Sequence, residues 1–179
     1  MWVMFKDVLP SICTVVVAII SSRMVIISAN KSVDRQKADK LQKDLENFYY
    51  PFLLLSKKTT QLYMALHQVN KEDCCSCLVY LLNGKRFDGN ALVIWKEIIV
   101  NNKKLNELII KYSSIINNKA LRDDLSKLST HYTMLELAND NLLKGNADIL
   151  SEYMFPSSVI ENIENEIEKI EKNIEDLSK

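Results

Sequence analysis

Apolar residues recur at intervals of three and four along most of the chain, the spacing that places side chains on one face of an α-helix. From residue 38 to residue 69 this spacing continues without a break through Pro51. Because proline lacks a backbone N–H, the pattern predicts either one long helix kinked at Pro51 or two stacked helices, with Pro51 opening the second. In both cases the junction lies near Tyr50. The apolar positions are Ala38, Leu41, Leu45, Phe48, Phe52, Leu55, Thr59, Leu62, Leu66 and Val69.

Three further helical segments follow before residue 156. A short apolar helix is predicted from about Asp73 to Leu82, closed by Asn83-Gly84, and residues 85–90 are predicted to form a loop. Two longer helices each have one apolar face, and Asn117, Asn118 and Lys119 form the turn between them. Such faces are buried most simply in an antiparallel bundle. The faces consist of Trp95, Ile98, Leu105, Ile109, Tyr112 and Ile116 in the first helix, and of Leu121, Leu125, Leu128, Tyr132, Leu135 and Leu142 in the second.

The last segment, residues 157–179, is predicted to be an acidic helix with a coiled-coil stripe that begins after Pro156. It carries three Lys against six Glu and one Asp, a net charge of −4. We expect it to pack in its own bundle, against a basic face or against a basic partner protein. The stripe is Ile160, Ile163, Ile167, Ile170, Ile174 and Leu177; the flanking acids are Glu164, Glu166 and Glu171, and the candidate basic face is Lys103, Lys104 and Lys111.

A different pattern marks the N-terminus, where 15 of the 22 residues from Val8 to Ala29 are apolar. A helix of that length is roughly 33 Å long, enough to cross a bilayer core of ~30 Å. Arg23 lies near one end, where its stem can reach the headgroups. The pattern predicts a transmembrane anchor; a cleaved signal peptide and a helix buried in the domain are the alternatives.

Basic residues beside the apolar stretch predict its orientation in the membrane. Arg23, Lys31, Arg35, Lys37, Lys40 and Lys43 follow its middle, whereas Lys6 alone precedes it. Because basic flanks stay on the cytoplasmic side, the C-terminal domain is expected to be cytoplasmic. Thr14, Ala18 and Ser22, next to Arg23, form a stripe that would let another membrane helix approach closely, although Ser and Thr are also simply tolerated in such spans.

The chain therefore divides into a transmembrane anchor (1–30), a juxtamembrane amphipathic helix (31–50), a helical bundle (51–156) and an acidic, heptad-patterned C-terminal helix (157–179). After the transmembrane helix, an antiparallel bundle of about four to five helices is expected. The fold class is all-α. Lys and Arg together number 23, as do Asp and Glu. Because the chain lacks the basic excess that neutralises phosphates, nucleic acid is not expected as a partner.

One constellation has the residue types of a metal site. Cys74 and Cys77 have C-x-x-C spacing and His67 lies seven residues before the first of them, but only Cys75 or the remote His131 could complete the set. We expect reduced, buried thiols instead, without metal or cofactor. Asn102 and Asn139 hold core-like positions in their helices. No motif for a nucleophile, a P-loop or a zinc hydrolase occurs, so no catalytic residue is predicted.

The block LENFYYPF (45–52) after a basic flank, and EYMFP (152–156) before a Glu-rich final helix, resemble small anchored helical proteins of unknown activity from bacteria, phages and mobile elements. The resemblance implies a bacterial source, and it brings no catalytic residue with it.

Three functions remain open from the sequence. The first is a membrane-tethered adaptor or scaffold that binds another protein. The second is a membrane-perturbing effector, acting in phage defence, whose spans self-associate through Thr14, Ala18 and Ser22, with Arg23 lining a pore. The third is a sensor whose bundle holds a small molecule or responds to stress.

Overall fold

The computed structural model describes residues 2–70, 76–144, 155–156 and 158–179, with the backbone alone described for residues 2–19. Within these residues every regular element is helical and no strand occurs, so the predicted all-helical class is confirmed. Two compact units make up the chain. We call Asp44–Lys169 the bundle unit, and Met1–Lys43 with Ile170–Lys179 the N-terminal unit.

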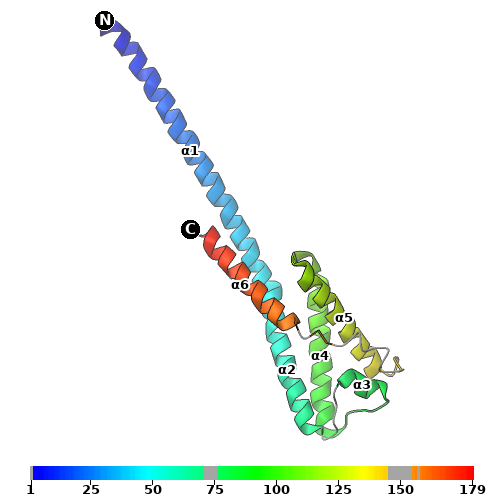
Figure 1. Ribbon diagram of the computed structural model, residues 1–179. Helices are drawn as coiled ribbons and strands as arrows, with labels where there is room; N and C mark the ends of the chain where they lie inside the picture. The colour runs from blue at the N-terminus through cyan, green and yellow to red at the C-terminus, as the bar shows by residue number, and fades with distance from the viewer. Residues whose placement is uncertain (1, 71–75, 145–154, 157) are drawn as a thin grey trace. The chain divides into compact units, whose positions relative to one another are not determined.

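Figure 1 shows the elements in chain order. They are α1 (Trp2–Asp44), the π-helical turn η1 (Leu45–Tyr49), α2 (Tyr50–Val69), α3 (Cys77–Leu82), α4 (Gly89–Tyr112), the 3-10 turn η2 (Ser113–Ile115), α5 (Lys119–Asn139) and α6 (Val159–Leu177). The start predicted for α3, at residues 73–75, lies outside the described residues.

Pro51 lies in the first turn of α2, a position where proline is tolerated. Immediately before it, the N–H of Tyr50 donates to the carbonyl of Leu45, five residues back, which is the hydrogen bond of a π-helix. The backbone keeps right-handed helical angles at Asp44, Tyr49 and Tyr50. The junction predicted near Tyr50 is therefore a π turn within a continuous helical backbone.

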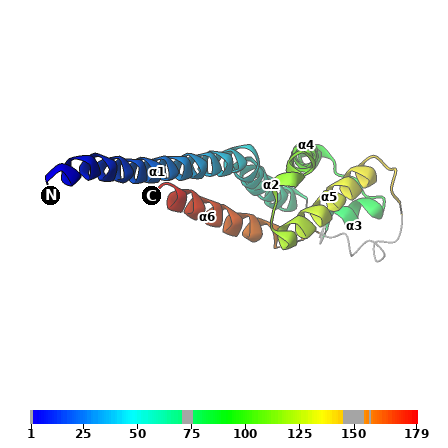
Figure 2. The same cartoon turned by 90° about the horizontal axis from the view of Figure 1, so that it is seen from above.

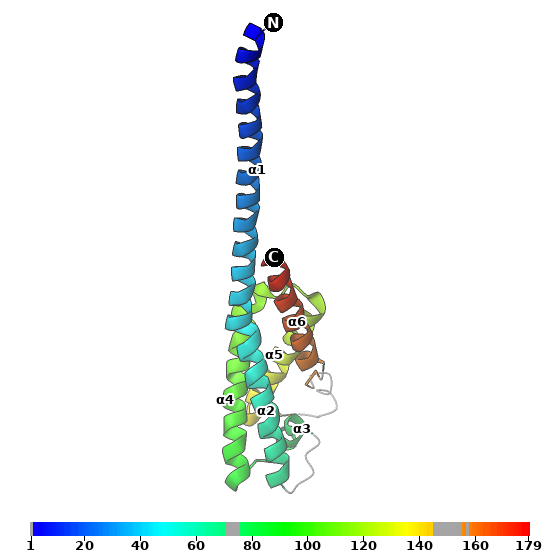
Figure 3. The ribbon, with the colours of Figure 1, turned by 90° about the vertical axis from the view of Figure 1, so that its left-hand side faces the viewer.

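α2 and α4 pack against each other in opposite directions, as Figure 3 shows. The ring centroids of Phe48 and Tyr112 are 6.1 Å apart, and farther along the pair Asn102 Nδ2 donates to the Tyr63 hydroxyl at 3.3 Å. Residue numbers thus rise along one helix as they fall along the other. The apolar faces predicted for both segments meet here, because each helix must remove its stripe from water.

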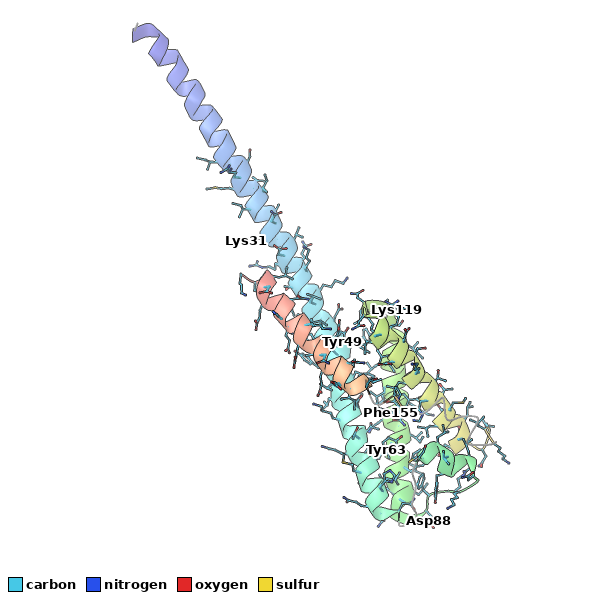
Figure 4. The ribbon with its side chains drawn as sticks, viewed as in Figure 1. Lys31, Tyr49, Tyr63, Asp88, Lys119 and Phe155 are labelled. Atoms are coloured by element: carbon cyan, nitrogen blue, oxygen red, sulfur yellow. The ribbon has the colours of Figure 1, made fainter. Side chains whose placement is uncertain are left out.

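α4 and α5 are also antiparallel. Ser129 Oγ donates to Asn106 Oδ1 at 2.6 Å, and Trp95 Nε1 donates to Asn139 Oδ1 at 2.7 Å. The turn between the two helices is the one expected, since the Asn118 side chain accepts from the Leu121 N–H and caps α5. Asp88, before α4, and Lys119, at the start of α5, are labelled at opposite ends of the bundle unit in Figure 4.

The first turns of α6 complete the bundle unit. Asp124 of α5 accepts hydrogen bonds from Ser158 Oγ at 3.0 Å and from Asn162 Nδ2 at 2.8 Å. Val159 and Ile163 are fully buried. The start of the acidic helix therefore packs within its own bundle, as expected, because its apolar stripe finds a face there.

An aromatic cluster of Tyr80, Phe87 and Trp95 closes the bundle unit at α3. The rings of Tyr80 and Phe87 stack at 4.7 Å, and those of Phe87 and Trp95 lie 4.9 Å apart. α3 ends where predicted: Gly84 follows it with φ +76°, a backbone angle that side chains with a Cβ rarely adopt. Arg86 then donates to the carbonyls of Leu81, at 3.0 Å, and Ala138, at 3.3 Å, near the ends of α3 and α5.

The N-terminal unit holds α1, with the last turns of α6 beside it (Figure 2). Four consecutive side chains of α1, Met24 to Ile27, are each more than half exposed. None of the helices is long and apolar enough to cross a membrane as far as the described residues go. The predicted anchor gains no support from that result, and most of its apolar stretch, residues 8–19, lies outside the side chains that the structure describes.

Candidate functional site

A cavity of about 290 Å³ lies within the bundle unit, between α2, the start of α3 and α5. Its volume is close to the lower end of small-molecule sites, which occupy roughly 300–1,000 Å³. Figure 4 labels two of its residues, Tyr63 on α2 and Phe155 ahead of α6. The lining residues are Ser56, Thr59, Thr60, Tyr63, His67, Ser76, Cys77, Leu78, His131, Tyr132, Leu135 and Phe155.

The α2 wall of the cavity is built from hydroxyl side chains spaced three and four residues apart. Ser56, Thr59, Thr60 and Tyr63 follow one another along this face. Thr59 Oγ1 donates to the Leu55 carbonyl at 2.8 Å, and Thr60 Oγ1 donates to the carbonyl of Ser56 at 3.0 Å. Because both threonines use their proton within the helix, they offer the cavity only lone pairs and methyl groups.

Ser56 differs from the two threonines. Its side chain is only 6% exposed, and its hydroxyl has no hydrogen-bond partner among the described residues. Leaving a buried hydroxyl unpaired costs about 1–3 kcal/mol. Ser56 therefore brings to the cavity wall a buried donor and acceptor whose hydrogen bonds are unmade. A rotation of its side chain toward the cavity would let a bound molecule or an ordered water satisfy them.

The α5 wall is aromatic and polar together. His131 is 6% exposed; its ring lies 6.2 Å from that of Tyr132 and 6.0 Å, edge to face, from that of Phe155. Burial, with a smaller contribution from Tyr63, raises the pKa of the Tyr132 phenol well above its ordinary value. The Tyr132 hydroxyl therefore keeps its proton at neutral pH and remains a hydrogen-bond donor.

Behind the cavity, Asn102 of α4 supports Tyr63. The Asn102 side chain is 2% exposed, and its Nδ2 donates to the Tyr63 hydroxyl. Of the two asparagines in core-like helical positions, Asn102 is thus buried, whereas Asn139 is half-buried and accepts from Trp95. By accepting from Asn102, Tyr63 is held as part of the wall, since a buried amide N–H strongly favours keeping its acceptor.

The cavity carries no full charge in its wall: none of the described lining residues is Asp, Glu, Lys or Arg. Hydroxyls, two imidazoles, one thiol and apolar groups remain. A neutral molecule fits this environment better than an ion, because a buried ion without a counter-charge loses its hydration without compensation.

The metal-like residues of the sequence come together in part. His67 and Cys77 both line the cavity, and so does His131. His131 is remote in sequence, but α5 packs beside α3 and brings it to the same cavity. Among the described residues, no group of three or more His, Cys, Asp or Glu could hold a metal ion. Cys77 is buried, as expected, while Cys74 and Cys75 lie outside the described residues.

Two of the three acids proposed as an interaction surface are used within the bundle unit. Glu164 pairs with Lys57 at 2.7 Å, and Glu166 Oε2 accepts from Asn118 Nδ2 at 3.2 Å. Burial raises the pKa of the nearby Tyr49 phenol to about 12, and the negative charge of Glu166 makes a smaller contribution in the same direction.

The basic partner of Glu164 is thus Lys57 of α2, and that of Glu166 is Lys169 of its own helix, at 3.5 Å. The face of Lys103, Lys104 and Lys111 suggested by charge alone is not used in this way, since Lys103 pairs with Glu136 at 2.7 Å. The remaining acid, Glu171, is exposed.

Of the four residues proposed for helix packing in a membrane, Ser22 and Arg23 are exposed on α1. The side chains of Thr14 and Ala18 lie outside the described residues. Their association with a second span stays a prediction.

Ser56, Tyr63 and Tyr132 were not singled out from the sequence as site residues. A signal was present for α2, because Ser56, Thr59 and Tyr63 share the helical phase of Phe52 and Leu66, which are core positions. Polar residues repeated in a core phase predict a buried polar interface. Nothing in the sequence shows that α5 leaves space opposite them.

Comparison with protein-family models, with curated proteins and with solved structures finds no match. The resemblance to small anchored helical proteins therefore stays a prediction. The geometry of the chain is the basis on which a function can be proposed.

Proposed function

We propose that the protein is a membrane-tethered helical module that senses a small molecule held between α2 and α5. The observation that carries the proposal is the cavity of about 290 Å³ with the buried, unpaired Ser56 hydroxyl in its wall. A bound molecule stabilises the packing that binds it, by an amount set by its concentration relative to its Kd. Occupancy would in this way favour one arrangement of α2 and α5.

The test is to fill the cavity with protein atoms. Xenon enters apolar cavities, and ¹²⁹Xe NMR reports whether it does so. The full chain should give a xenon signal shifted by the cavity, and Ser56→Met, whose side chain occupies the space, should reduce that shift. Ser126→Met adds the same side chain at an exposed position of α5 and should leave the shift unchanged. Equal shifts in all three proteins would overturn the proposal.

The tether is proposed from the sequence of α1. Residues 8–29 are mostly apolar, and Met24, Val25, Ile26 and Ile27 are consecutive, so their side chains point around the whole helix. A helix that is apolar on every side is suited to a bilayer or to a large core. The basic residues after Arg23 would keep the bundle unit on the cytoplasmic side.

Carbonate extraction of membranes from expressing cells tests the tether. The wild-type chain should remain in the pellet, and Val16→Asp with Val17→Asp should move it to the supernatant, because a carboxylate within a span costs several kcal/mol (about 2.5–3.5 on insertion scales). The control adds the same charges through Ser32→Asp and Gln36→Asp, outside the apolar stretch, and should stay in the pellet. Extraction of the wild-type chain would overturn the tether.

An adaptor role ranks second. Two of the acids that an adaptor would use already bond within the bundle unit, Glu164 in an ion pair and Glu166 in a hydrogen bond. Glu171 is exposed. A sensor also needs a partner that reads its state, so a protein that binds the bundle unit is compatible with both roles.

A further inference from the structure

The chemistry of the cavity wall goes beyond the presence of a binding site and defines a class of ligand. The unpaired hydrogen-bonding group belongs to Ser56, which is 6% exposed. Tyr132 lines the same space from α5. Two helices therefore contribute a hydroxyl-bearing residue each to the wall of one small volume. Among the other described lining residues, Leu78, Leu135 and Phe155 are apolar, and the threonine hydroxyls are bonded within their own helix.

The polar end of such a ligand must accept a hydrogen bond. Serine and tyrosine hydroxyls both donate, and an oxygen with two lone pairs can accept from both at once. A carbonyl oxygen meets this requirement, and so does the oxygen of an alcohol or an ether. Thr59 and Thr60 cannot compete for the ligand oxygen as donors, because their protons are bonded to the carbonyls of Leu55 and Ser56.

The rest of the ligand must be apolar and uncharged. Leu78, Leu135 and Phe155 line the cavity, and Thr59 and Thr60 contribute methyl groups. No Asp, Glu, Lys or Arg occurs among the described lining residues, so a charged ligand finds none of the permanently charged side chains as its partner. At about 290 Å³ the space suits a compact molecule and not a long acyl chain.

We propose that the cavity binds a compact, neutral, mainly apolar molecule through a carbonyl or hydroxyl oxygen that accepts hydrogen bonds from Ser56 and Tyr132. This inference rests on the proposed sensor function and deepens it. Ser56 and Tyr132 select the polar end of the ligand, while Leu135 and Phe155 cover its apolar body.

Three probes of similar shape separate the requirements: cyclohexanone, methylcyclohexane and cyclohexanecarboxylate. They are titrated into the full chain in lipid nanodiscs, with ¹³C-labelled methyl groups of Leu135 and Thr60 as reporters in the cavity wall. The ketone should bind about 3- to 10-fold more tightly than the hydrocarbon, the usual effect of one or two neutral hydrogen bonds. The carboxylate should bind at least 10-fold more weakly than the ketone, since its charge would be buried without a partner.

Substitutions then assign the selectivity to its residues. Ser56→Ala and Tyr132→Phe remove one hydroxyl each and should lower the affinity for cyclohexanone about 3- to 10-fold, leaving that for methylcyclohexane unchanged. Ser126→Ala removes an exposed hydroxyl from α5 and should change neither affinity. A selectivity that survives both cavity variants would overturn the assignment.

The failures of the two proposals can be told apart. Equal affinities for ketone and hydrocarbon, a carboxylate that binds as tightly as the ketone, or no binding of any probe while xenon still enters would overturn the ligand class alone. Absence of the cavity-dependent xenon shift would overturn the sensor function, and the ligand class with it.

Discussion

The aromatic cluster and the cavity lie next to each other in the bundle unit, and Cys77, Leu78 and Leu135 belong to the surroundings of both. They differ in how their polar atoms are satisfied. At the cluster, Trp95 donates to Asn139, and Arg86 donates to the carbonyls of Leu81 and Ala138.

At the cavity, the Ser56 hydroxyl has no partner among the described residues, and the Asn102 carbonyl oxygen behind the wall has none either. A folded protein keeps few such groups unless they serve a purpose. The difference indicates that the cluster holds the fold together, while the polar atoms at the proposed binding site are left unpaired at a cost in stability.

The largest effect is expected from Trp95→Ala. Trp95 is 2% exposed, and its loss removes a buried indole and leaves the Asn139 oxygen without its donor. Large-to-small changes of this kind cost about 3–5 kcal/mol of the free energy of unfolding. Urea denaturation followed by circular dichroism measures the loss, and Val93→Ala, at a 64% exposed position of α4, is the control. Similar losses in both variants would remove the cluster from its structural role.

Arg86→Ala should come next. The guanidinium donates to the carbonyls of Leu81 and Ala138, which also accept from backbone N–H groups, so its removal loses charge-assisted hydrogen bonds, at a cost of about 1–3 kcal/mol. Arg86→Lys should recover only part of this, because an ammonium cannot reproduce the planar fork. Lys104→Ala, at an exposed position of α4, controls for the loss of a positive charge. Full recovery by lysine would show that charge alone matters.

The burial of Tyr132 in the cavity wall should make the free energy of unfolding depend on pH in alkaline solution. Burial raises the pKa of Tyr132 above its ordinary value, so the folded chain holds this proton more tightly than the unfolded chain does. The associated stability is complete below about pH 10 and declines as the pH rises beyond it, by about 1.4 kcal/mol for each pH unit.

Tyr132→Phe should remove this part of the decline when unfolding is measured between about pH 9 and about pH 11.5, on either side of the ordinary phenol pKa. Tyr50→Phe, which removes a hydroxyl from a 40% exposed ring of α2, provides the comparison. Identical slopes for Tyr132→Phe and the wild-type chain would contradict the burial of the phenol.

The smallest effects are expected for two serine substitutions, which should change the stability in opposite directions. Ser56→Ala removes an unpaired hydroxyl and should leave stability unchanged or raise it by up to about 1 kcal/mol. Ser129→Ala removes a hydroxyl that donates to Asn106 at 2.6 Å, and should lower stability by about 1 kcal/mol. Thermal unfolding of both variants is sufficient. A loss at Ser56 as large as that at Ser129 would mean that the Ser56 hydroxyl is already satisfied.

Much of the fold could be predicted from local pattern. The stripe through Phe48, Phe52 and Leu66 is buried, and Gly84 and Asn118 end and begin helices where their chemistry indicated. These features depend on residues within a few positions of one another, so the spacing of side chains is enough to predict them. The π turn before Pro51 could not be predicted from the sequence, because one kinked helix and two stacked helices have the same spacing of apolar residues.

The sequence alone determined the helices, their apolar faces and the antiparallel arrangement that short connections impose. Only the tertiary structure decided that Lys57, not the lysines of α4, pairs with Glu164, and that His131 and Tyr132 face Ser56 and Tyr63 across a cavity. The physical reason is that helix periodicity specifies which residues share a face but not which face of another helix lies opposite. A cavity is the space that two such faces fail to fill, and it exists only once they are packed together.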